Sequence, residues 1–112
     1  MKRFGSVIEV KEEKLDEYVK LHADVWQEVL DMIKQSNIHN YSIYLRKLQD
    51  GKHYLFSYFE YTGEDFDMDM AKMAADPKTL KWWDVCKPCQ NPLPGLAEGE
   101  WWASMEEVFH AD

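Results

Sequence analysis

The sequence lacks the features that mark membrane proteins and secreted, disulfide-rich domains. No apolar run approaches the roughly 18 residues that a membrane-spanning helix needs, and the N-terminal stretch MKRFGSVIEV has no apolar segment typical of a signal peptide. Only two cysteines are present, too few for a disulfide framework. We therefore expect a cytoplasmic protein with reduced thiols and no membrane partner.

Positive charge is also scarce. Thirteen basic residues stand against 21 acidic ones, which gives a net charge of −8. A chain with this excess of negative charge is repelled by phosphate backbones and by anionic lipids. The charge therefore argues against nucleic acid as a partner, whereas a neutral small molecule meets no such barrier.

Aromatic residues, in contrast, are plentiful. The chain has 112 residues and contains five Trp, six Tyr and five Phe. We detect no repeat, linker or low-complexity stretch, so a single domain over residues 1–112 is expected. Because aromatic rings dominate both ligand pockets and interfaces, this surplus favours a core that also forms a pocket or a dimer interface.

Hydrophobic periodicity predicts four strands and three helices. The expected strands are Phe4–Val10, Tyr41–Arg46, His53–Tyr61 and Trp101–Phe109, with Asp50-Gly51 as a hairpin turn between the second and third. The expected helices are Glu12–Gln35, ended by Ser36-Asn37, then Glu64–Ala75, then one that starts at Asp76-Pro77 and stops near Pro88, before a loop over Asn91–Gly99.

The order β-α-β-β-α-β predicts an α+β, ferredoxin-like fold. In that fold an antiparallel four-stranded sheet carries its helices on one face. The other face stays bare, and a bare aromatic face is usually covered by a second subunit. We therefore expect a homodimer.

The long predicted helix carries two polar side chains on its apolar side. Tyr18 and His22 are four residues apart and so lie on one face. They could be core residues with satisfied hydrogen bonds. Alternatively, they project into a cavity, where an imidazole beside a phenol forms an acid–base pair with Tyr18 as the hydrogen-bond donor.

Two tyrosines of the second strand compete for the same cavity. Tyr41 and Tyr44 are an odd number of residues apart, so they point to opposite faces of the sheet. One of the two must face the helices, and the strand pattern does not say which.

The motif Cys86-Lys87-Pro88-Cys89 has the spacing of a redox site or of half a zinc site. A redox motif of this kind opens a helix, where the helix N-terminus lowers the thiol pKa. Here the motif follows a helix, and the four histidines supply no paired spacing that completes a four-ligand zinc site. Neither redox nor metal chemistry is therefore favoured.

Trp82 and Trp83 come just before this motif. Adjacent helical residues point about 100° apart, so only one of the two indoles can be fully buried in one core. The other faces a pocket or a partner, where a flat indole could stack on the apolar face of a sugar ring. The alternative is that both pack in the core or at an interface.

Four stretches together resemble the L-rhamnose mutarotase family. They are EYVKLHADVW (17–26), IHNYSIYL (38–45), KWW (81–83) and MEEVFH (105–110). The similarity extends from Arg3 to His110. The spacing from Tyr18 through His22 and Trp26 to the His39-Asn40-Tyr41 triplet and Tyr44 agrees with the family without gaps.

The resemblance implies a homodimer of the dimeric α/β-barrel type that needs no metal or cofactor. Such an isomerase interconverts the α and β anomers of a 6-deoxy-L-hexopyranose monosaccharide, here L-rhamnose, by acid–base opening and closure of the ring. The resemblance further implies that His22 is the catalytic proton donor, assisted by Tyr18. It implies sugar contacts from Tyr18, Tyr41, Trp82 and Trp83, and so decides for Tyr41 over Tyr44.

The segment CKPCQNPLPGLAEGEWWASMEEVFH (86–110) departs from the simpler rhamnose enzymes by extra residues before the last strand. In this it looks more like family members associated with L-fucose catabolism. L-Fucose is therefore an alternative substrate. Two other classes share the fold or the ligand: a cofactor-free monooxygenase or haem-handling protein of the dimeric α/β-barrel type, and a non-catalytic sugar-binding module.

Overall fold

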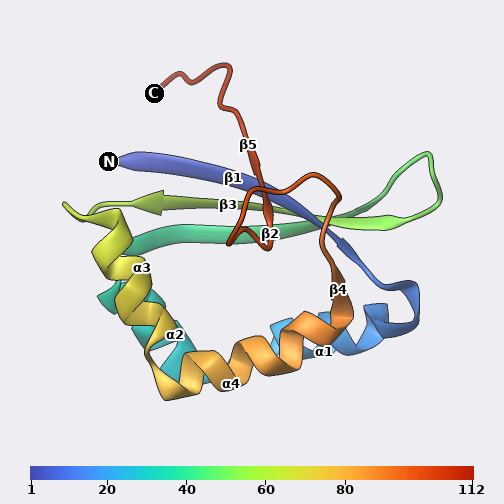
Figure 1. The fold of residues 1–112 in the computed structure, drawn as a ribbon, viewed down its shortest axis with the longest axis horizontal. Helices are drawn as coiled ribbons and strands as arrows, with labels where there is room; N and C mark the ends of the chain where they lie inside the picture. Colours follow the sequence, from blue (N-terminus) through green and yellow to red (C-terminus); the bar gives the residue numbers. More distant parts are fainter.

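An antiparallel sheet forms one layer of the computed structural model, which describes residues 1–112 (Figure 1). Strand β1 (Lys2–Val10) pairs with β3 (His53–Tyr61) over its whole length, and β2 (Ile38–Lys47) pairs with the other edge of β3. Two short strands, β4 (Gln90–Asn91) and β5 (Ala103–Met105), share the free edge of β1. The order β2-β3-β1-β4 is that of the ferredoxin-like fold and confirms the prediction.

The helices form the second layer, on one side of the sheet (Figure 1). They are α1 (Leu15–Ala23), α2 (Gln27–Gln35), α3 (Phe66–Ala74) and α4 (Pro77–Cys86), with 3-10 turns η1 (Glu12–Lys14) and η2 (Lys87–Cys89). Helix α4 lies against α2 and α3 and leads into η2, which contacts α1. None of these helices is both long and apolar enough to cross a membrane.

The prediction of one continuous helix over Glu12–Gln35 is wrong. The chain leaves helical geometry at Asp24 (φ −146°, ψ 67°) and at Trp26 (φ −59°, ψ 137°), so the segment divides into η1, α1 and α2. Asp is a weak helix former because its side chain competes for backbone hydrogen bonds. The break also lets Trp26 pack edge-on against Trp82, with 5.1 Å between ring centroids.

The last strand is much shorter than the predicted Trp101–Phe109. Only Ala103–Met105 pairs with β1. The C-terminal end of the same β1 edge pairs instead with β4, which precedes residues 92–102 in the chain. Two consecutive glutamates follow Met105. Successive side chains of a strand point to opposite faces, so at these two positions neither face would bury an apolar residue. Val108 and Phe109 consequently stay exposed.

Local signals at helix starts and at the hairpin are confirmed. Asp76 caps α4 by accepting hydrogen bonds from Thr79, at 3.0 Å from the backbone nitrogen and 2.8 Å from the hydroxyl, and Pro77 opens the helix. The backbone of Gly51 has φ +82° in the turn between β2 and β3. That left-handed conformation suits glycine, which has no Cβ to clash.

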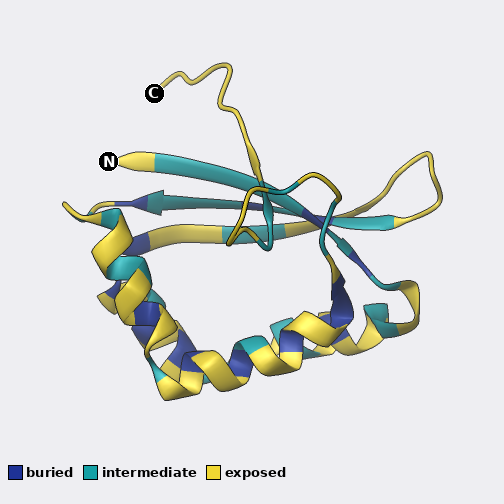
Figure 2. Ribbon diagram, viewed as in Figure 1, coloured by how far each residue is buried: buried dark blue, intermediate teal, exposed yellow.

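The core lies between the two layers (Figure 2). Inward residues of the sheet, such as Ile8, Val10 and Leu55, pack against Val29 and Trp82 from the helices. The buried positions of each helix follow its inner side, as the periodicity predicts.

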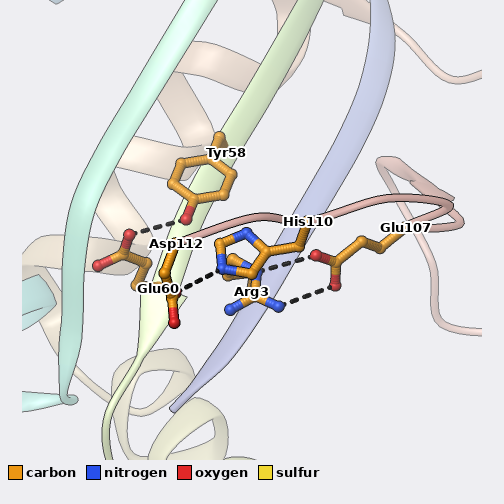
Figure 3. A network of polar contacts seen from close by, with 6 residues as sticks. All are labelled: Arg3, Tyr58, Glu60, Glu107, His110 and Asp112. Atoms are coloured by element: carbon orange, nitrogen blue, oxygen red, sulfur yellow. Dashed lines mark hydrogen bonds and ion pairs between the residues drawn. The ribbon is translucent and has the colours of Figure 1, made fainter.

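The outer face of the sheet carries no helix. Figure 3 shows a polar network on it, in which the Nε of Arg3 donates to a carboxylate oxygen of Glu107 at 2.9 Å. The hydroxyl of Tyr58 donates to Glu60 at 2.7 Å. Arg3 pairs with Glu60 across β1 and β3, so these residues share one face of the sheet.

Candidate functional site

A cavity of about 440 Å³ lies between the helices and the inner face of the sheet. Two thirds of its lining residues are apolar or aromatic, 14 of 21, which is typical of small-molecule sites. The cavity is lined by all five residues to which the family resemblance assigns catalysis or sugar contacts: Tyr18, His22, Tyr41, Trp82 and Trp83.

Tyr18 and His22 stack on one another in α1. Their ring centroids are 4.1 Å apart and their planes differ by 22°. This contact follows from their spacing of one helical turn, which places both on the inner face. Tyr18 is buried and His22 is half-buried, so the pair lies at the wall of the cavity.

The hydrogen bond of His22 defines which ring nitrogen carries the proton in the neutral imidazole. Its Nδ1 lies 3.0 Å from the backbone carbonyl oxygen of Tyr18. A carbonyl can only accept, so Nδ1 carries the proton and Nε2 keeps its lone pair. Burial lowers the pKa of His22 below its ordinary value of 6.5, although the backbone hydrogen bond opposes this shift. At neutral pH His22 therefore presents a proton acceptor.

Tyr18, in contrast, presents a donor. Burial raises the pKa of its hydroxyl well above the usual value of 10.0, so the group stays protonated at neutral pH. The side-chain amide of Gln90 lies 3.4 Å from this hydroxyl. A proton acceptor and a proton donor thus lie side by side in the lining of the cavity.

Trp82 and Trp83 take different environments, as their adjacency on a helix predicts. Trp82 is buried and meets His22 edge-on, with 5.2 Å between ring centroids. Trp83 is half-buried, and the Nζ of Lys87 lies 6.0 Å from its ring and 5.5 Å from that of Trp101. All three indoles line the cavity.

Of the two tyrosines of β2, Tyr41 faces the cavity. Its ring lies 5.5 Å from that of Phe59, centroid to centroid, and lines the cavity although the residue is 42% exposed. Tyr44 is 63% exposed and does not line the cavity. Desolvation of the hydroxyl raises the pKa of Tyr41 to about 12. The strand bulges between His39 and Ser42, with Asn40 at φ +50°, just where Tyr41 turns inward.

Two serines on the floor of the cavity were not singled out from the sequence. Ser6 of β1 and Ser57 of β3 lie opposite each other, with their hydroxyl oxygens 2.5 Å apart. A signal was available, because each serine sits at an inward position of its strand between apolar neighbours. A polar residue at such a position marks either a buried hydrogen bond or a contact to a ligand.

Gln90 and Trp101 are two further residues of the cavity that the sequence did not indicate. Gln90 follows η2 and Trp101 lies near the end of the segment between β4 and β5, yet both line the cavity. The Nε1 of Trp101 donates to the Oε1 of Gln90 at 2.7 Å. No periodicity predicts this contact, because β4 has only two residues and Trp101 lies outside any helix or strand.

The cysteines are free and buried beneath this site. Cys86 lies in the last turn of α4 and Cys89 in η2, the end of the helix that the sequence indicated. Burial raises the pKa of Cys86 to about 12 and that of Cys89 to about 11. Both are therefore protonated thiols at neutral pH, and no group of three or more His, Cys, Asp or Glu residues is placed to hold a metal ion.

Comparisons with known proteins give a consistent result. A family model described as L-rhamnose mutarotase matches residues 3–111. L-Rhamnose mutarotases of Oceanobacillus iheyensis and Bacillus subtilis are 35% and 34% identical to the chain over 112 residues, and each alignment covers 100% of both proteins. Both alignments therefore span every segment of the chain that lines the cavity.

A solved structure agrees in fold. The crystal structure of an L-rhamnose mutarotase from Formosa agariphila superposes with a TM-score of 0.75 and covers 100% of both chains. The two sequences are 20% identical, so this likeness supports the architecture rather than the chemistry.

Proposed function

Since the chain belongs to the L-rhamnose mutarotase family, we propose that it interconverts the α and β anomers of L-rhamnose. The observation that carries this proposal is the stacked pair in α1, where a neutral imidazole with a free Nε2 lies beside a protonated phenol. Residues 1–112 would act as one mutarotase domain, and no step of the reaction calls for a metal or cofactor.

Anomer exchange needs one proton moved between two oxygens. A proton leaves the O1 hydroxyl as the C1–O5 bond breaks, C1 and O1 form the aldehyde, and O5 gains a proton. Rotation about C1–C2 then lets O5 attack the other face of the aldehyde, with the proton transfers reversed. No bond to the protein forms at any stage.

His22 is suited to both proton transfers. O1 and O5 are bonded to the same carbon, so one ring nitrogen can reach each of them. Its Nε2 accepts the proton of O1 and, as imidazolium, delivers a proton to O5, which makes His22 the proton donor to the ring oxygen. Positioned acid–base groups typically supply about a hundred to ten thousandfold in rate.

The remaining side chains hold the sugar. The hydroxyl of Tyr18 donates to an oxygen at the reacting carbon, and Tyr41 contacts a further hydroxyl. Trp82 and Trp83 provide the flat wall against which the apolar face of the ring rests, while Ser57 offers a polar floor. An uncharged sugar also suits a chain with a net charge of −8.

L-Fucose is the second candidate substrate, and the segment between β4 and β5 is the reason. That segment, where the sequence looks more like members associated with L-fucose catabolism, places Trp101 and Trp102 at the cavity. The two sugars differ in the orientation of hydroxyl groups, which a site with fixed hydrogen-bonding groups can discriminate strongly.

The protein is further inferred to be a cytoplasmic homodimer. The bare outer face of the sheet and the exposed apolar residues of the C-terminal stretch, Val108 and Phe109, support a second copy on this side. Two free, buried thiols are typical of proteins from reducing compartments.

The direct test is magnetisation transfer between anomeric protons by NMR, with L-rhamnose and L-fucose measured side by side. Exchange faster than the buffer background, and faster for L-rhamnose than for L-fucose, is expected. Sugar binding without exchange would favour a non-catalytic module, and oxygen uptake with a quinol would favour a monooxygenase. Either result would overturn the proposal.

A further inference from the structure

Gln90 links the proposed catalytic tyrosine to the segment between β4 and β5. It is 6% exposed and lies in β4, one residue beyond η2. Its amide nitrogen is 3.4 Å from the Tyr18 hydroxyl and its amide oxygen is 2.7 Å from the Nε1 of Trp101. A buried amide with a partner on each side has one orientation that satisfies both.

Trp101 sets that orientation. An indole N–H is a donor only, so it must face the amide oxygen of Gln90 rather than its nitrogen. The amide nitrogen of Gln90 is thereby turned toward Tyr18, where its N–H groups can only donate. The indole N–H of Trp101 can only donate, so it fixes the donor and the acceptor in both hydrogen bonds of Gln90.

The orientation of Gln90 determines where the hydroxyl proton of Tyr18 can point. A phenol has a single proton and accepts through its lone pairs. Because the oxygen of Tyr18 accepts from Gln90, its own O–H is free to point elsewhere, and the cavity is the side that Tyr18 lines. A group that accepted from Tyr18 at this position would instead draw the proton away from a ligand.

We propose that Gln90, held by Trp101, is a positioning residue that directs the Tyr18 hydroxyl into the cavity as a donor to the substrate. This inference rests on the proposed function, because it assigns a purpose to the donor at the reacting carbon. It also gives the segment between β4 and β5 a part in the chemistry, since Trp101 belongs to that segment. Lys87, 5.5 Å from the Trp101 ring, helps to hold the indole in place.

Two substitutions test the direction of the hydrogen bonds. Gln90→Glu keeps the size of the side chain but replaces the donor by a second acceptor, so Tyr18 would donate to it rather than to the sugar. Trp101→Phe keeps an aromatic wall but removes the N–H that orients the amide. We expect the exchange rate at saturating sugar to fall on the order of tenfold for Gln90→Glu and severalfold for Trp101→Phe, with smaller changes in KM. Gln90→Met, which leaves the Tyr18 proton free to rotate, is the matched control and should lose less than Gln90→Glu.

Repeating the substitutions in a second variant separates an effect on the Tyr18 hydroxyl from a general effect on packing. Each substitution is repeated in Tyr18→Phe, which has no hydroxyl to direct. The inference predicts that Gln90→Glu and Trp101→Phe then change the rate by less than about twofold. Equal losses in both backgrounds, or a greater loss for Gln90→Met than for Gln90→Glu, would overturn it.

The failure of this inference is distinguishable from that of the proposed function. If wild-type protein binds a sugar without exchanging its anomers, the proposed function fails, and the same variants are compared by sugar Kd in both backgrounds. The indole proton of Trp101, followed by ¹H–¹⁵N NMR and assigned by its loss in Trp101→Phe, reports the contact without any activity. Slow solvent exchange of this proton that becomes fast in Gln90→Met supports the inference, and fast exchange in the wild type overturns it.

Discussion

At the scale of single residues, the site depends on two neighbouring groups whose environments favour different protonation roles. Burial lowers the pKa of His22 and raises that of Tyr18, so one stays neutral and the other stays protonated at the same pH. Pairs of this kind are a common basis for acid–base assignment. Here they arise from two positions one turn apart on a nine-residue helix.

The lowered pKa of His22 predicts how the rate depends on pH. The neutral ring must accept a proton, so the catalysed rate should be constant above the ordinary value of 6.5 and fall as the pH drops through the lower pKa in the folded protein. The same shift favours folding above 6.5, and this contribution is lost as the pH falls, because the unfolded chain takes up the proton first. The measurement is the exchange rate against pH, corrected for the uncatalysed rate in each buffer. A rate that rises with added acid would contradict this role.

The raised thiol pKa values predict that both cysteines are unreactive in the folded protein. Cys86 and Cys89 are buried and protonated at neutral pH, and alkylation requires an accessible thiolate. Iodoacetamide at neutral pH should leave the native protein unlabelled and label both residues in denaturant, as read by mass spectrometry. Rapid labelling of either residue without denaturant would refute the prediction.

The sequence predicted only some of the residues of the site. Tyr18 and His22 were found because helical spacing places both on an apolar face, and the Trp82–Trp83 pair because adjacent indoles cannot share one core. Ser6 and Ser57 were missed although strand alternation points them inward. Gln90 and Trp101 could not be found, because β4 is too short to show a period and Trp101 lies outside any helix or strand.

At the scale of elements, the inner face of the helical layer is preserved even where the helix predicted for Glu12–Gln35 breaks. Trp26 and Val29 still pack on the inner side after the break at Asp24. Hydrophobic periodicity therefore predicts which face of the segment is buried. It does not reveal a break in the helix when the residues after the break still face the core. The same limit explains the last strand, since its pairing ends where glutamates replace apolar residues.

Helix caps, in contrast, were predicted from sequence because their chemistry is local. Asp76 accepts from Thr79 and caps α4, the helix that carries Trp82 and Trp83. Asp76→Ala should lower the free energy of unfolding by about 1 kcal/mol, measured by urea denaturation. Asp84→Ala, at an exposed position of the same helix, is the control and should change it much less. Equal effects of the two substitutions would argue against a capping role.

At the scale of the whole molecule, the two faces of the sheet have different roles. The inner face and the helices enclose the cavity, whereas the outer face carries polar and aromatic groups without a covering layer (Figures 1 and 3). The strand order could be predicted from the sequence of elements, because short antiparallel connections and the crossover rule leave few arrangements. The wall contributed by residues 92–102 could not, since that segment has no regular structure.

The proposed dimer predicts that a charged substitution on the outer face of the sheet changes the oligomeric state. Phe56 pairs with Val7 and with Tyr44 on this face, so Phe56→Asp should convert a dimer into a monomer of 13.3 kDa by light scattering. Leu80→Asp changes an exposed apolar residue of α4 on the other side and should leave the dimer intact. A wild-type protein that is monomeric at micromolar concentration would contradict the proposal.

The central claim is that His22 moves a proton at the anomeric centre of L-rhamnose. Magnetisation transfer between the two anomeric protons of L-rhamnose, with wild type and His22→Ala at equal concentrations, tests it most directly. The account predicts fast exchange with the wild type and, for a folded His22→Ala, a loss of about a hundredfold or more, toward the buffer rate. Wild-type exchange at the buffer rate, or full activity in His22→Ala, would contradict it.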